Sequence, residues 1–190
     1  MKGERQDAVQ GGAGGRPERR ALDSEQIIRA AIGLLDAEGV DGLTMRRLGE
    51  LLDTTAAAIY WHVRNKQELM RLASDAIWAE LRLPDLEEVG WREASIAMAQ
   101  EMHAMFQRHS WLVPAMPVDA PYGPGRTLRD DHLLAICSAA GFTASDAEHA
   151  RETIVAFVVG SCVTATSRRS LVLGLQAVHD GLQTRIAARP

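Results

Sequence analysis

The residues best suited to contact another molecule lie together between positions 54 and 66, in the stretch TTAAAIYWHVRNK. Its three alanines favour a helix without bulk, which lets the helix backbone approach a partner closely. Tyr60, Trp61 and His62 follow and combine ring surface with groups that hydrogen-bond, and Lys66 adds a positive charge. This combination indicates a surface that binds an anionic partner such as the backbone of DNA.

The sequence lacks the motifs that would indicate catalysis. It has no glycine-rich phosphate loop, no HExxH pair and no GxSxG nucleophile motif. The two cysteines, Cys137 and Cys162, lack zinc-type spacing and stand among alanines and valines, which favours buried thiols. We therefore expect neither an enzyme nor a resident metal or cofactor.

Composition indicates a folded protein outside the membrane. The chain of 190 residues is 46% hydrophobic and 24% charged, which is ordinary for a globular protein. The longest apolar run, residues 154–163, is shorter than the roughly 20 residues that span a bilayer, and the start has no apolar signal segment. A soluble, cytoplasmic protein with no membrane partner is expected.

The formal net charge of −4 argues at first against a nucleic-acid partner. The first 72 residues, however, are neutral overall, and basic residues gather within them at positions 16–20, 45–47 and 63–66. DNA binding needs only the contacted face to be positive, so this charge distribution remains compatible with it.

Capping residues and helical spacing predict an all-α chain. The expected helices are 23–39, 44–52, 55–62, 66–81, 91–109, 126–140, 145–166 and 170–188. In the second of these we expect Leu48, Leu51 and Leu52 to point inward, and Asp53 to adopt the left-handed conformation of the turn that follows. Asn65 and Glu68 form a capping-box-like pair at the start of the fourth.

The second and third expected helices form a helix-turn-helix. The major groove of B-DNA is about 12 Å wide and admits one helix, so such a protein must project one helix with a thin outer face. The segment Thr55–His62 fits this role because its alanines are small and its end is aromatic.

The stretch LTMRRLGELLDTTAAAIYWHVRNKQEL resembles the DNA-binding signature of the TetR family of bacterial transcription regulators, over residues 23–81. HSWL and GFTASDAEHARETIVAFVVGSCV also resemble the regulatory domain of its tetracycline-repressor subfamily. Carried over position by position, the resemblance implies that Arg46 reaches a guanine or a phosphate. The other implied DNA contacts are Thr44, Thr55, Ala56, Ala57, Ala58, Tyr60, Trp61, His62 and Lys66.

This chain departs from the family where base reading is expected. The family often has polar residues early in the recognition helix, whereas alanines can touch a thymine methyl but cannot hydrogen-bond. Two further readings stay open: Trp61 could pack in the core instead, and an N-terminal arm, residues 1–20, could enter the minor groove.

The resemblance also implies an effector site on the fifth expected helix. Its candidate lining is Met98, Met102, His103, Met105, Phe106, His109 and Trp111, although a methionine-rich face is also typical of an ordinary core. An apolar or aromatic effector would suit it. The subfamily recognises a magnesium–drug complex, but no histidine lies between Trp111 and Asp131, and Thr164 and Ala165 stand where an acidic residue is expected. We expect no metal at this site.

Together these observations predict a flexible arm (1–20), a three-helix helix-turn-helix domain (21–67) and a helical regulatory and dimerisation domain (68–190). The expected protein is a homodimeric repressor that a small-molecule effector releases from a palindromic double-stranded operator. The last two helices, with Gly160 and Ser161 allowing close approach, are expected to form the dimer interface. The alternative is a helical interaction or sequestering protein with the same fold and weak, non-specific DNA binding.

Overall fold

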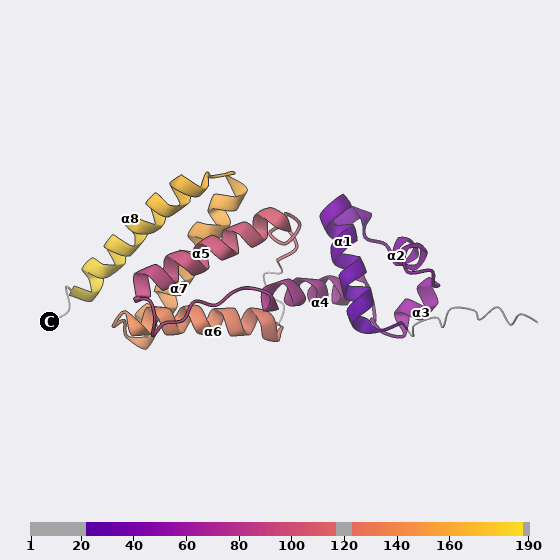
Figure 1. Ribbon diagram of the computed structural model, residues 1–190, viewed down its shortest axis with the longest axis horizontal. Helices are drawn as coiled ribbons and strands as arrows, with labels where there is room; N and C mark the ends of the chain where they lie inside the picture. Colours follow the sequence, from indigo (N-terminus) through magenta and orange to yellow (C-terminus); the bar gives the residue numbers. More distant parts are fainter. Residues whose placement is uncertain (1–21, 117–122, 188–190) are drawn as a thin grey trace, which may run out of the picture.

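The computed structural model describes residues 22–116 and 123–187, and the regular structure within them is entirely α-helical (Figure 1). The expected arm at residues 1–20 lies outside the described residues. The helices are α1 (Ser24–Gly42), α2 (Met45–Leu51), α3 (Ala56–Tyr60), α4 (Lys66–Ala79), α5 (Trp91–Arg108), α6 (Pro124–Ala139), α7 (Ala144–Val163) and α8 (Arg168–Ala187).

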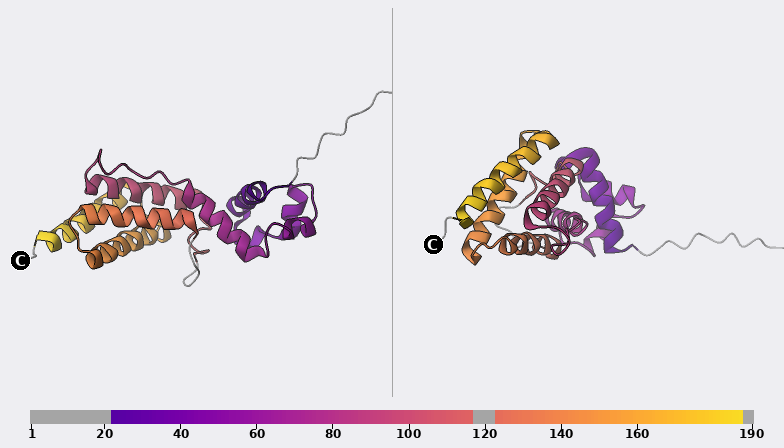
Figure 2. Two further views of the ribbon diagram at one scale, coloured as in Figure 1. Left: turned by 90° about the horizontal axis from the view of Figure 1, so that it is seen from below. Right: turned by 60° about the vertical axis from the view of Figure 1, so that its left-hand side comes forward.

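The helices form an elongated molecule with two ends. Helices α1, α2 and α3 gather at one end, α5 to α8 at the other, and α4 runs between them (Figures 1 and 2). Helix α4 packs on both ends, since its main neighbours are α6 and α1. Any movement of α4 relative to α6 therefore reaches the first three helices directly.

Side-chain caps fix the starts of α1 to α4 where the sequence predicts them. Asp23 forms a full capping box with Gln26, and Thr44 caps α2 by accepting from the Arg47 N–H at 3.2 Å. Asn65 caps α4 through the Glu68 N–H at 2.8 Å. The expected pair of Asn65 and Glu68 departs from a capping box on one side. The Glu68 carboxylate accepts from the N–H of Arg64 at 2.7 Å, one residue before the cap.

Two helix ends carry a glycine in the left-handed backbone conformation. Gly39, with φ 71°, breaks the regular backbone of α1 at the residue where the first helix is expected to stop, and a short helical turn continues to Gly42. Gly141, with φ 93°, follows the end of α6. Both positions suit glycine because a Cβ atom disfavours this conformation.

The prediction that Leu51 points inward was wrong. Leu48 is fully buried and Leu52 packs partly against the core, but Leu51 is 58% exposed. Leu51 is the last residue of α2, and the chain then turns toward α3, so Leu52 takes the place against the core.

The sequence predicts two buried thiols. Cys137 is buried, whereas Cys162 is only half-buried. Among residues 22–116 and 123–187, no helix combines the length and the apolar character needed to cross a membrane.

Candidate DNA-binding interface

Helices α2 and α3 form a tight helix-turn-helix. Asp53 adopts φ 50° in the turn, as the sequence predicts. Gly49 brings the two helices together, because a Cβ atom there would lie 2.9 Å from the Thr54 carbonyl oxygen and 3.3 Å from the Ala56 nitrogen. A side chain at position 49 would therefore push the start of α3 away from α2.

Helix α3 is shorter than expected but is firmly anchored. The Thr55 hydroxyl accepts the Ala58 N–H at 3.1 Å, which caps the helix and leaves the hydroxyl hydrogen able to donate. Ile59 and Val63 are buried on the inner side. Ala57 is exposed on the outer side, so the helix presents little bulk to a partner.

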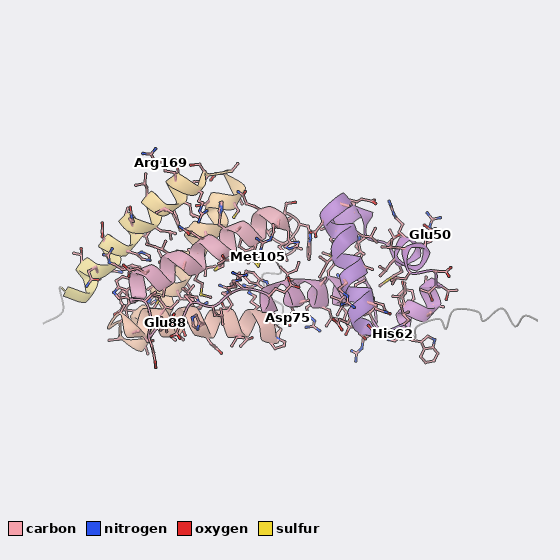
Figure 3. The ribbon with its side chains drawn as sticks, viewed as in Figure 1. Glu50, His62, Asp75, Glu88, Met105 and Arg169 are labelled. Atoms are coloured by element: carbon pink, nitrogen blue, oxygen red, sulfur yellow. The ribbon has the colours of Figure 1, made fainter. Side chains whose placement is uncertain are left out.

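The aromatic residues after the alanines face solvent. Trp61 is 89% exposed and Tyr60 53% exposed, and the neighbouring His62 is also exposed. Trp61 therefore does not belong to the core of this chain. Figure 3 places His62 and Glu50 at the end of the molecule formed by the first three helices, away from α5 to α8.

The basic residues of this end have different surroundings. Arg46 is free to extend, with 84% of its side chain exposed and its Nε 3.9 Å from a Glu50 carboxylate oxygen. The Lys66 ammonium instead donates to the Val40 carbonyl at 2.7 Å, just after the break in α1. As the structure stands, Lys66 thus joins α4 to α1.

Sequence reasoning missed four residues that hold this end together: Gly49, the pair Arg47 and Glu38, and Asp36. Gly49 could have been found as a glycine inside a short helix, where only a close approach justifies it. Arg47 pairs with Glu38 of α1, and Asp36 of α1 bonds residues after α5. Neither of these two pairs carries a local sequence signal.

Most of the expected effector residues lie together on the inner side of α5. Met98, Met102, Met105, Phe106 and His103 are all buried. Phe106 meets Trp78 of α4 edge to face, with the ring centroids 5.4 Å apart. The Nε2 atom of His103 is buried and has no hydrogen-bond partner among residues 22–116 and 123–187.

His109 and Trp111 join the two ends of the molecule. One carboxylate oxygen of Asp36 accepts from Trp111 Nε1 at 2.8 Å and lies 2.7 Å from His109 Nδ1. These two side chains are thus engaged by α1. Within the described residues, no three histidine, cysteine or acidic side chains are placed to hold a metal ion together.

Two family models match the chain. Residues 27–73 match the model described as "Bacterial regulatory proteins, tetR family", and residues 83–186 match "Tetracyclin repressor-like, C-terminal domain". An HTH-type transcriptional regulator of Saccharopolyspora erythraea is 34% identical over 77% of this chain and 64% of its own length. The chain spans less than two thirds of that relative.

Two solved structures have the same fold over most of both chains. BioQ with its natural double-stranded DNA operator is 31% identical, with a TM-score of 0.75, and the match covers 86% of this chain and 99% of that one. ActR of Streptomyces coelicolor in complex with (S)-DNPA is 25% identical, with a TM-score of 0.76 and coverage of 88% and 100%.

Proposed function

Because the chain belongs to the TetR family of bacterial regulators, we propose that it is a homodimeric transcriptional repressor released from a palindromic operator by a small-molecule effector. The observation that carries this proposal is the exposed end of the helix-turn-helix, where Trp61 and Arg46 project into solvent from a rigid support. Large exposed aromatic and basic side chains at one end of a molecule are typical of a binding surface.

In the proposed complex, α3 enters the major groove and its surroundings grip the backbone. Tyr60, Trp61, His62 and the Thr44 and Thr55 hydroxyls contact phosphates or sugars, and Arg46 reaches a guanine or a phosphate. Ala56, Ala57 and Ala58 allow the close approach. Lys66 joins the phosphate contacts when its ammonium exchanges the hydrogen bond to the Val40 carbonyl for one to a phosphate. This exchange costs little because the site is partly solvated.

The proposed dimer forms through α7 and α8. Apart from the backbone of its own helix, a Cβ atom at Gly160 would meet no atom of the described residues within 4 Å, and Val163 and Leu173 are 71% and 58% exposed. A second copy can therefore approach this face closely and cover its apolar side chains. Ser161 is buried and donates to the Phe157 carbonyl, so it faces the interior of its own chain rather than the partner.

Dimerisation would place two α3 helices one turn of DNA apart, about 34–36 Å, and predicts half-sites at that spacing. We propose that residues 21–67 bind DNA and that residues 68–190 bind the effector and the second subunit. The effector would occupy the face of α5 around Met102, His103 and Phe106 and shift α4, which favours a conformation unable to bind DNA. The protein would act in the cytoplasm, without catalysis and without a cofactor.

The direct test is DNA binding by the full-length chain. Genomic fragments retained by the protein would be sequenced, and the shared palindrome measured by fluorescence anisotropy. Arg46→Ala and Trp61→Ala should each weaken binding about tenfold, because each removes a contact of about 1–3 kcal/mol. Arg46→Ala should also reduce the salt dependence of binding if the guanidinium pairs with a phosphate.

Arg108 offers a matched control, since it is an exposed arginine in the last turn of α5, outside both the helix-turn-helix and the proposed dimer helices. Arg108→Ala should leave operator affinity unchanged. The proposed interface would be wrong if all three variants bound the operator as tightly as the original protein.

A second function is favoured by one observation, the three alanines that cannot hydrogen-bond to bases. An interaction or sequestering protein with this fold would bind DNA only through its backbone. Salt-dependent binding with equal affinity for the retained palindrome and a scrambled sequence would support that alternative and exclude the repressor.

A further inference from the structure

An acidic side chain stands on the surface that the proposed function turns toward DNA. Glu50 belongs to the last turn of α2, at the end of the molecule formed by the first three helices (Figure 3). Its side chain is 64% exposed. DNA is a polyanion, so a carboxylate at its surface weakens binding unless it meets a group that donates a hydrogen bond. The position of Glu50 therefore needs an explanation other than attraction to the DNA backbone.

The other glutamates of the first four helices have hydrogen-bond partners within the protein. These partners are the guanidiniums of Arg29 and Arg47 and the backbone N–H of Arg64, for Glu25, Glu38 and Glu68 in turn. The Glu50 carboxylate accepts no hydrogen bond from the described residues, and its ion-pair partner is Arg46, whose Nε lies 3.9 Å away. Glu50 can therefore accept a hydrogen bond from another molecule without losing one within the chain.

The pair of Arg46 and Glu50 contributes little to the stability of the fold. Both side chains are largely exposed, at 84% and 64%, and the distance of 3.9 Å is longer than a hydrogen bond. Exposed pairs four residues apart on a helix are screened by water and salt, so they stabilise the helix only slightly. A structural role therefore does not account for this pair.

The pair lies along the edge of α2 that adjoins α3. Gly49 marks the side of α2 that meets α3, because a Cβ atom there would lie 3.3 Å from the Ala56 nitrogen. Arg46 precedes Gly49 by three residues and so lies on that side, one turn earlier. Glu50 follows Arg46 by four residues along the same edge. Both charged groups therefore stand beside the start of the helix that the proposed function places in the major groove.

The first turn of α3 itself offers few groups that hydrogen-bond to bases. The alanines at 56–58 have methyl side chains, and the Thr55 hydroxyl already accepts the Ala58 N–H at 3.1 Å. Hydrogen-bonding groups for the bases there must therefore come from a neighbouring element. A guanidinium only donates and an ionised carboxylate only accepts, so Arg46 and Glu50 together supply both functions.

We propose that Arg46 and Glu50 together read one G·C base pair of the operator, and that Glu50 determines specificity at that position. In the major groove this base pair presents the guanine acceptors N7 and O6 beside the N4 amino group of cytosine, which is a donor. The Arg46 guanidinium donates to guanine, and the Glu50 carboxylate accepts from the cytosine amino group. The placement of α3 in the major groove rests on the proposed function.

The same chemistry rejects other base pairs at this position. An A·T pair sets the O4 acceptor of thymine against the Glu50 carboxylate and the N6 donor of adenine against the Arg46 guanidinium. The carboxylate also repels phosphates, so it weakens binding to every sequence that offers no donor in return. Glu50 thus provides specificity by rejection as well as by contact, in a reading helix whose alanines provide little.

Selection from a random double-stranded DNA library by the full-length protein tests the assignment. The bound sequences should carry a fixed G·C pair at one position of each half-site. Arg46→Ala and Glu50→Ala should each reduce the preference at that same position about tenfold or more, as expected for the loss of a good base contact. Glu25→Ala is the matched control, because Glu25 also forms an exposed ion pair with an arginine four residues away, Arg29. It should keep the preference.

A modified base tests the contact of Glu50 with the cytosine amino group directly. Fluorescence anisotropy would compare the selected site with the same site carrying 2-pyrimidinone, which lacks that amino group, in place of the cytosine. The original protein and Glu25→Ala should each lose about tenfold more affinity on this replacement than Glu50→Ala does. Glu50→Ala should also bind a scrambled sequence more tightly than the original protein, because a charge that repels phosphates is removed.

The inference is overturned if the selected sequences have no fixed G·C pair, if Glu50→Ala keeps the preference at that pair, or if 2-pyrimidinone weakens binding equally in the original protein and Glu50→Ala. Repression is measured separately, from a promoter that carries the selected site. A base preference that depends on Glu50, in a protein that does not repress this promoter, would uphold the inference and refute the repressor function. Repression through a site whose sequence does not depend on Glu50 would do the reverse.

Discussion

The bond between Asp36 and Trp111 offers a quantitative test of how the two ends of the molecule are joined. Asp36→Ala removes the carboxylate that accepts from Trp111 Nε1 at 2.8 Å and pairs with His109 at 2.7 Å. Trp111 is buried, so an unpaired indole N–H there costs about 1–3 kcal/mol. His109 and Asp36 are partly exposed, and their pair adds about 0–1 kcal/mol.

We therefore expect Asp36→Ala to lower the free energy of unfolding by about 1–4 kcal/mol. Urea unfolding of the full-length chain would be measured for Asp36→Ala, Trp111→Phe and the double variant. Trp111→Phe removes the donor that Asp36→Ala leaves unpaired, so the two changes should be less than additive, by about 1–2 kcal/mol. Asp41→Ala, an exposed acidic residue of the same helix, should change stability by less than about 0.5 kcal/mol.

The same variant tests communication between the ends. Without Asp36, α1 loses its bond to the segment after α5, so a bound effector should release operator DNA less completely while binding with unchanged affinity. The reasoning is refuted if the two substitutions are additive within about 0.3–0.5 kcal/mol, which is the range for independent sites. It is also refuted if release by the effector is the same in Asp36→Ala as in the original protein.

Two further predictions concern a close backbone contact and a buried histidine. Gly49→Ala should lower operator affinity and lower the free energy of unfolding by about 1–3 kcal/mol, since its Cβ would clash with the Thr54 carbonyl. Gly33→Ala should instead stabilise α1 by about 0.5–1 kcal/mol in urea unfolding, because its Cβ would meet no atom of the described residues within 4 Å beyond its own helix backbone. His179 is buried, with Nε2 2.9 Å from the Ser95 hydroxyl, and burial together with Arg92 lowers its pKa below the ordinary 6.5. The unfolded chain therefore takes up this proton first, so the contribution of His179 to stability is complete above pH 6.5 and is lost as the pH falls below it. Urea unfolding at pH 7.5 and pH 5 should show this fall, and His179→Gln should reduce it; an unchanged fall in the variant would contradict the assignment.

The sequence by itself determined the helices and the motif they build. Asp23, Thr44 and Asn65 cap helices through N–H groups three residues away, and such bonds depend only on the local chain. The left-handed turn at Asp53 is equally local. The all-α fold, the helix-turn-helix and the TetR family could therefore be predicted before any contact between distant residues was known.

Only the tertiary structure decided what the individual side chains of the site contact. Asp36 meets Trp111 across 75 positions of sequence, and Lys66 donates to a carbonyl 26 positions away. Arg129 is polar by type, yet it lies buried against Trp78. These outcomes depend on the angles at which α1, α4 and α6 pack, and residue type and spacing along one helix carry no information about those angles. Helical periodicity tells which residues share a face of one helix, whereas the partner of that face is set by the packing of the whole chain.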